Sequence, residues 1–150
     1  MAKQAKRQLA GSGEALPAGA VGEEIAAEQN TYITTSLVNS TTVGFLSITL
    51  TPGVWIISAS QTVLQNGSTG TAFSSLLSDV STSSNTISGV GVSISDNNAW
   101  PPNNVTATTI THQPFLYRAT TTKTIYLNSF ALFTAGTPSR KGNLRAIRIA

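Results

Sequence analysis

Residues 49–63 read TLTPGVWIISASQTV, a Pro-Gly turn followed by a run in which large apolar residues alternate with small or hydroxylated ones. In a β-strand, residues of one parity share a face. Trp55, Ile57, Ala59 and Val63 are all at odd-numbered positions, and Gln61 is the one polar residue at an odd position in this run. Ser58, Ser60 and Thr62 have the opposite parity. The stretch therefore predicts a strand with Trp55 in a buried core and a hydroxyl-rich outer face.

Similar alternation along the chain predicts an all-β protein. Residues 43–50 (VGFLSITL) precede the Pro-Gly turn and are expected to form a hairpin with residues 54–63. The other expected strands lie at 71–80, 90–94, 105–112, 115–122, 124–133 and 144–150. Residues 23–30 (EEIAAEQN) could instead form about two helical turns. About eight short strands without intervening helices favour an antiparallel β-sandwich of the jelly-roll type.

Composition limits the classes of protein to which the chain can belong. Its 150 residues suit one domain, of which 40% are hydrophobic and only 10% charged; an average soluble domain has about 25% charged residues. There is no cysteine, which excludes disulfides and thiolate chemistry and fits a chain made in a reducing cytoplasm. No apolar run is long enough to span a membrane, and the charged N-terminus has no apolar segment of the kind that signal peptides contain.

Charge is concentrated near the chain ends. Residues 1–20 are rich in Ala, Gly, Gln and Lys, and we expect them to form an extended N-terminal arm before a β-domain at 21–150. Lys3, Lys6 and Arg7 are the residues through which this arm would bind a partner. Residues 118–150 carry six basic groups and no acidic one. No nucleic-acid-binding motif accompanies these bases, so neither nucleic acid nor membrane is an expected partner.

The sequence contains no motif that indicates catalysis. His112 is the only histidine, and Asp79 and Asp96 are the only charged residues between Gln29 and Tyr117. A Ser-His-Asp arrangement would have to use these residues, but no GxSxG motif is present. His112 is therefore expected at a strand edge or in a loop. We predict no enzymatic activity, no catalytic residue and no cofactor.

Metal binding is not expected either. Residues 95–98 (SDNN) offer oxygen ligands, but an EF-hand loop requires further acids at fixed positions, so an Asx-turn is the preferred interpretation. The loop at 81–104 is rich in Ser, Gly, Asn and Pro and contains Trp100 before two prolines. Exposed tryptophans can stack on sugars or fill a partner's pocket, whereas a loop tryptophan can also fold back onto the core. If this loop binds a receptor, the candidate residues are Asp96, Asn97, Asn98 and Trp100.

Four stretches resemble a family of small β-domains in tailed-bacteriophage particles, found in head decoration (cement) proteins and in tail-fibre or receptor-binding tips. They are ALPAGAVGEEIAA at 15–27, LTPGVWIISASQTVLQNG at 50–67, SSLLSDVSTSSNTI at 74–87 and TTTKTIYLNSFALFTAGTPSRKGNLRAIRIA at 120–150. The resemblance implies a trimeric jelly roll without enzymatic activity. The chain has no coiled-coil, collagen-like or β-helix repeat of the kind that long fibres use.

We therefore expect a non-enzymatic virion protein made in the host cytoplasm. The leading hypothesis is a homotrimeric capsid decoration (cement) protein that binds the major capsid protein through the N-terminal arm and the β-domain. The alternative is a short tail-fibre or receptor-binding protein whose 81–104 loop contacts a host surface glycan. In that alternative the attachment partner is a tail protein of the phage.

Overall fold

The computed structural model describes residues 18–33, 37–64, 73–87, 94–96, 107–133 and 138–150. These residues contain eight strands: β1 (Glu24–Ile33), β2 (Thr41–Leu50), β3 (Gly53–Leu64), β4 (Phe73–Ser81), β5 (Ile94–Asp96), β6 (Ala107–Ala119), β7 (Lys123–Phe133) and β8 (Ser139–Arg148). They contain no helix long and apolar enough to cross a membrane. The predicted arm at 1–20 falls outside this part of the chain except for residues 18–20, which begin a turn before β1.

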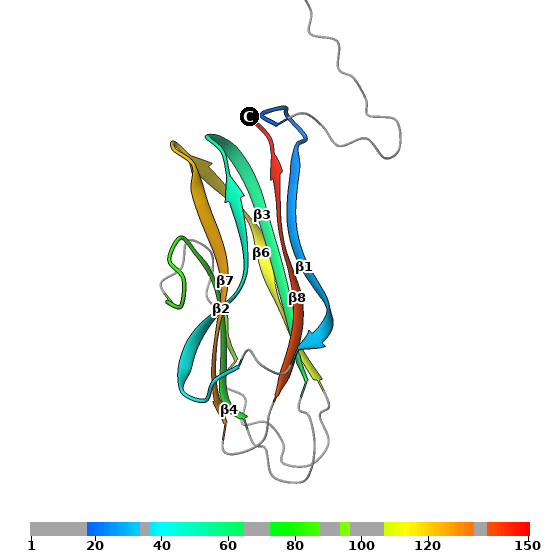
Figure 1. Cartoon of the computed structure of the whole chain (residues 1–150), viewed down its shortest axis with the longest axis vertical. Coiled ribbons are helices and arrows are strands. Elements are labelled where there is room, and N and C mark those ends of the chain that lie inside the picture. Colours follow the sequence, from blue (N-terminus) through cyan, green and yellow to red (C-terminus); the bar gives the residue numbers. More distant parts are fainter. Residues whose placement is uncertain (1–17, 34–36, 65–72, 88–93, 97–106, 134–137) are drawn as a thin grey trace, which may run out of the picture.

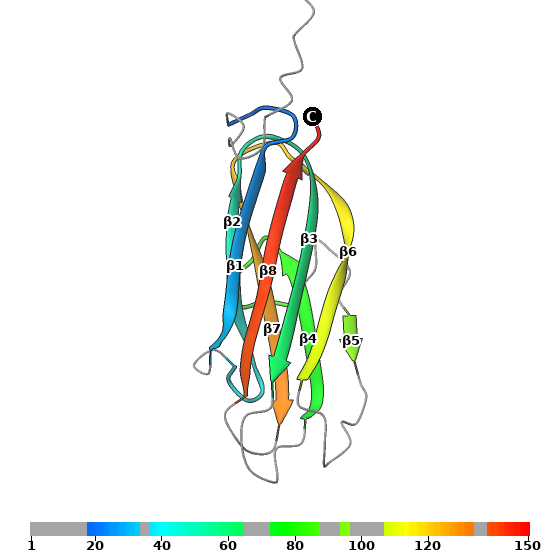
Figure 2. The ribbon, with the colours of Figure 1, turned by 90° about the vertical axis from the view of Figure 1, so that its right-hand side faces the viewer.

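The strands form two four-stranded antiparallel sheets that face each other (Figure 1). One sheet has the order β1-β8-β3-β6, which Figure 2 shows from its outer side, and the other has the order β2-β7-β4-β5. Each sheet alternates early and late strands of the chain, which is the strand order of an eight-stranded jelly roll. The predicted antiparallel jelly-roll sandwich is confirmed.

The predicted hairpin at 43–63 is wrong, although its turn is where we expected it. β2 ends at Leu50 and β3 begins at Gly53, but β2 pairs with β7 while β3 pairs with β6 and β8. The Pro-Gly turn therefore carries the chain from one sheet to the other. Gly53 has a φ of +155°, and a Cβ atom there would clash with Nη1 of Arg148. The turn thus needs glycine both for its backbone angle and for space.

Other elements also differ from the prediction. Residues 24–33 are not helical but form edge strand β1, which pairs with β8. The two strands expected at 105–112 and 115–122 are one strand, β6, with a register shift opposite Ser58. Pro114 lies in this irregular part, and β6 is a sheet edge, where a missing N–H is tolerated. Strand β5 at Ile94–Asp96 shares only Ile94 with the short strand expected at 90–94, whose other residues lie outside the described residues.

The alternation that we predicted for β3 is confirmed. Trp55, Ile57 and Val63 have no solvent exposure, and Ala59 is 2% exposed. The indole N–H of Trp55 donates to the Thr51 carbonyl (3.0 Å), so its polar atom is paired although the ring is buried. Gln61, the one polar residue with this parity, is also fully buried.

The core consists of two apolar clusters. The larger one surrounds Trp55 and fills the half of the sandwich that contains both described chain ends. The smaller cluster, in the other half, is formed by Leu37, Val63, Leu76, Ile110, Ala131 and Phe133. A bulge in β2 between Gly44 and Leu46 turns consecutive residues Phe45 and Leu46 toward the larger cluster.

Candidate interaction surface

The only histidine of the chain lies inside the sandwich. His112 of β6 is 1% exposed, and one of its ring nitrogens, Nε2, is 2.8 Å from the hydroxyl oxygen of Ser78 on β4. Beside this pair, the Ser129 hydroxyl of β7 donates to the buried Gln61 amide oxygen of β3. Both hydrogen bonds join one sheet to the other. The prediction that His112 lies at a strand edge or in a loop is wrong, because His112 is inside strand β6 and its side chain points into the core.

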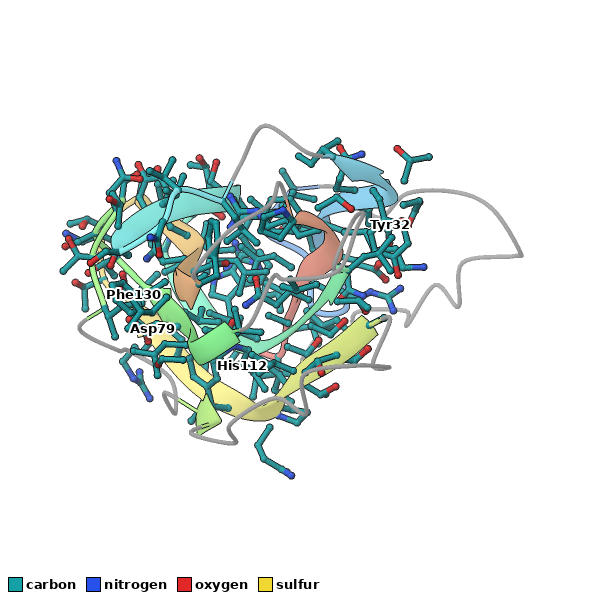
Figure 3. The ribbon with its side chains drawn as sticks, turned by 90° about the horizontal axis from the view of Figure 1, so that it is seen from below. Tyr32, Asp79, His112 and Phe130 are labelled. Carbon is teal, nitrogen blue, oxygen red and sulfur yellow. The ribbon has the colours of Figure 1, made fainter. Side chains whose placement is uncertain are left out.

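This arrangement does not assemble a Ser-His-Asp site. Asp79 follows Ser78 in β4, so the two side chains point to opposite faces of the sheet. Asp79 is nevertheless fully buried, on the outer side of its sheet (Figure 3). Ser78 and His112 have almost no solvent exposure through which a substrate could reach them. Among the described residues, no group of three or more His, Cys, Asp or Glu side chains could hold a metal ion.

A buried arginine occupies the interior near the β2 bulge. Arg140 of β8 has no solvent exposure, and its guanidinium lies 4.2 Å from the centre of the Phe45 ring. Burial lowers the pKa of Arg140 to about 10, because the low-dielectric interior disfavours the charged form. The residue therefore stays positively charged at neutral pH, and its role is to pack inside the sandwich.

The other predicted site residues lie almost entirely outside the described residues. Lys3, Lys6 and Arg7 of the arm are in the segment 1–17, and Asn97, Asn98 and Trp100 are in the segment 97–106. Asp96 is the last residue of β5, and its backbone pairs with Leu76 of β4. The structure thus leaves the arm and the receptor loop as predictions.

Part of the outer face of the β2-β7-β4-β5 sheet, around Asn128 of β7, is covered by the chain that follows β4. Asn128 of β7 points outward but has no solvent exposure. Its Nδ2 donates to the Ser81 hydroxyl and to the carbonyls of Ser83 and Thr86, each at 3.0 Å, and its Oδ1 accepts from the Asn85 amide at 3.0 Å. These four hydrogen bonds hold residues 81–86 against the sheet.

The outer face of the β1-β8-β3-β6 sheet instead carries exposed apolar side chains in one row. Ile147 of β8 is in register with Ile56 of β3, and Ile56 with Leu116 of β6. Their exposed fractions are 39%, 39% and 63%. We call these three residues the apolar row. The hydroxyl-rich outer face predicted for β3 is observed only beyond the row, where Asn143 donates to Ser60 and the hydroxyls of Thr62 and Thr109 are 2.9 Å apart.

The apolar row lies at the end of the sandwich where residues 18–23 and 148–150 meet, which we call the terminal end (Figures 1 and 2). Two further exposed apolar residues are at this end, Val21 (68%) and Ile149 (41%). Backbone hydrogen bonds run from Gly22 N–H to the Arg148 carbonyl (2.8 Å) and from Arg148 N–H to the Glu23 carbonyl (2.9 Å). The segment 1–17 therefore continues from a point beside the apolar row.

A buried ion pair fixes the terminal end. Arg148 Nε donates to the Glu23 carboxylate at 2.9 Å, Nη1 donates to the Pro52 carbonyl at 2.6 Å, and Nη2 donates to the Thr51 hydroxyl. Its guanidinium also lies 4.4 Å from the Trp55 ring centre. Burial raises the pKa of Glu23, but the Gly19 amide and Arg148 lower it by more, so the pKa is below its ordinary value.

Comparisons with known proteins found similarity only in structure. No family model and no curated protein matches this chain. A chain in the structure of infectious bursal disease virus, Gt strain, is 12% identical with a TM-score of 0.41, and the match covers 87% of this chain and 32% of that one. For the Gx strain, the identity is 11%, the TM-score 0.42, and the coverage 89% and 32%. This chain thus spans about a third of those chains, and likeness at this level carries no argument about function.

Proposed function

We propose that the chain is a non-enzymatic structural protein of a bacteriophage particle, made in the host cytoplasm and incorporated into the virion. Within that class, we propose a homotrimeric capsid decoration (cement) protein. It would bind and stabilise the particle surface through its N-terminal arm and its β-domain. The sequence resemblance points to this class, and the jelly-roll fold agrees with it, although a fold alone does not define a function.

The observation that carries the proposal is the apolar row on the outer face of the β1-β8-β3-β6 sheet. Three large aliphatic side chains from three neighbouring strands are exposed together, and Val21 and Ile149 extend the apolar area at the terminal end. Contiguous apolar surface of this kind is typical of sites where another protein binds. His112 and Asp79, in contrast, are buried in the fold.

The position of the arm supports the same function. The segment 1–17 joins the domain at the terminal end, beside the apolar row, so arm and row could engage one neighbour. Lys3, Lys6 and Arg7 would then bind acidic groups of the major capsid protein, or of a tail protein in the receptor-binding alternative. Flexible terminal segments commonly become ordered when they bind a partner.

The test is to locate the protein on purified phage particles by mass spectrometry and immunogold labelling. We expect label distributed over the head. Label confined to the tail, together with loss of host adsorption in a Trp100→Ala variant, would favour the receptor-binding alternative and its glycan partner. Absence of the protein from particles would contradict the proposal.

A second experiment tests the arm. Deleting residues 2–17 keeps the turn in which the Gly19 amide donates to the Glu23 carboxylate (2.7 Å), so the domain should fold and remain trimeric. Incorporation into particles should be lost. Unchanged occupancy of the shortened chain would show that the arm is not the attachment element.

A third experiment tests the absence of enzymatic chemistry. Asp79→Asn, Asp96→Asn and His112→Ala should leave particle attachment intact, with only stability costs of about 0.5 to 3 kcal/mol. Turnover of a glycan or peptide by the wild-type chain that disappears in one of these variants would overturn the non-enzymatic assignment.

A further inference from the structure

Charges on the outer face of the β1-β8-β3-β6 sheet are distributed unevenly between its two edges. The exposed acidic side chains of the described residues, Glu24 and Glu28, both belong to edge strand β1. The opposite edge strand, β6, carries exposed Arg118 and no acidic residue. Edge strand β1 thus carries only acidic charges and edge strand β6 only a basic one, and Glu24 is also paired with Arg145 of the adjacent strand β8.

The two edges also correspond in height along the sandwich. The pairing places Glu24 next to Ile147, Ile147 next to Ile56, and Ile56 next to Leu116. Arg118 is two residues beyond Leu116 in the same strand and has the same parity. Glu24 thus lies at one end of the apolar row, while Leu116 and Arg118 lie at the other.

We infer that the β6 edge of one copy packs against the β1 edge of the next copy, head to tail around a ring. Leu116, the most exposed member of the row, would contact Val21 and Ala26 of the neighbour, and Arg118 would face the neighbour's Glu24. In each copy, the outer face of the β1-β8-β3-β6 sheet turns toward the ring axis, so Ile56 and Ile147 are also covered. This arrangement rests on the proposed trimer and specifies how its subunits meet.

The charge distribution selects this arrangement over an edge-to-edge two-fold dimer. A two-fold contact between edges joins β1 to β1 or β6 to β6, which would bring Glu24 and Glu28 of two copies together, or two copies of Arg118. A face-to-face two-fold dimer would instead place β1 of one copy opposite β6 of the other, so a dimer found by sedimentation equilibrium would overturn the ring. A head-to-tail contact joins unlike edges and can close into a ring. The irregular part of β6 around Pro114 interrupts its ladder, so side chains, rather than a continuous intermolecular sheet, would make the contact.

Charge reversal tests the inference on the full-length chain by sedimentation equilibrium. Arg118→Glu and Glu24→Lys should each weaken association by about tenfold or more. The double variant should recover most of the loss, because the pair is restored with its signs exchanged. Lys123→Glu also replaces a basic residue by glutamate, but at an exposed site on β7 of the other sheet, so it should have little effect on association. Thermal melting of each variant checks that Glu24→Lys, which also loses its ion pair with Arg145, remains folded.

The outcomes separate this inference from the proposed function. A trimer that is indifferent to Arg118→Glu, or a double variant without recovery, would overturn the edge-to-edge contact and leave the trimer standing. A wild-type chain that stays monomeric would overturn both the ring and the trimer. Particle localisation would then still decide whether the chain is a virion protein.

Discussion

The two outer faces of the sandwich differ in what covers them. On the β2-β7-β4-β5 side, Asn128 and Asp79 point outward and are still fully buried, and four hydrogen bonds of Asn128 hold residues 81–86 over the sheet. On the β1-β8-β3-β6 side, Ile56, Ile147 and Leu116 point outward and are exposed. Part of the first face is thus covered by the protein's own chain, whereas the second face presents a row of apolar side chains to its surroundings.

This difference suggests that the two outer faces of the fold have different roles. Covering part of a face with the chain's own loop adds stability but leaves that part unavailable to a neighbour. An uncovered row of aliphatic side chains contributes little to the isolated domain, and it becomes favourable when another molecule removes it from water. We therefore propose that the first face contributes to the stability of the fold and that the second takes part in assembly. The predictions below test this proposal.

The largest expected effect belongs to the core that both sheets share. Trp55→Ala removes a fully buried ring together with its contact to the Arg148 guanidinium. We expect a loss of about 3 to 5 kcal/mol in the free energy of unfolding. Ile56→Ala, one residue further and on the outer face, should cost less than about 1 kcal/mol in dilute protein. Chemical denaturation measures both, and equal costs would contradict the alternation of β3.

A somewhat smaller effect is expected on the covered face. Asn128→Ala removes four hydrogen bonds and leaves buried groups of residues 81–86 without them, so stability should fall by about 2 to 4 kcal/mol. Association should not change at concentrations where the variant is folded. Thr49→Ala, at an exposed position of the same face, is the control and should be nearly neutral. A variant that keeps its stability but dissociates would reverse the assignment of the two faces.

The smallest expected effect is a change in the stability of the fold at acid pH, which arises from the terminal end. The folded pKa of Glu23 is below its ordinary value of 4.5, so its ion pair with Arg148 stabilises the fold fully above that pH. The contribution is lost as the pH falls through the lower folded value. Glu23→Gln should therefore be less stable than the wild type at neutral pH, and the difference should shrink in acid. Thermal midpoints across this range measure it, and a difference independent of pH would show that the charge of Glu23 is unimportant.

Much of the fold could be predicted from local patterns. Alternation around Trp55 gave the buried face of β3, and turn chemistry at residues 52–53 gave its start. The hairpin prediction failed because strand pairing depends on partners far along the chain: β2 pairs with β7, not with its sequence neighbour. The prediction of two strands in place of β6 was wrong because Pro114 is a strong signal for a strand break. An irregular edge strand nevertheless accommodates this proline.

The candidate surface was harder to find because its members are far apart in sequence. Ile56, Leu116 and Ile147 come together only through the jelly-roll strand order. One local signal existed: Ile56 has the same parity as Ser58 and Ser60, so the alternation already placed a large aliphatic side chain on the outer face. The burial of Asp79 had no such signal, because its cover comes from tertiary structure.

The most direct test of the account compares solvent access at one residue on each outer face. The chain has no cysteine, so Ile56→Cys and Leu132→Cys each place a single thiol at positions that are 39% and 38% exposed in the isolated chain. In the assembled protein, we predict slow maleimide labelling at position 56 and fast labelling at position 132. The two rates should become similar when Leu116→Asp is added to prevent assembly. Equal labelling of both thiols in the assembled wild-type background would contradict the claim that the β1-β8-β3-β6 face is the one through which the protein assembles.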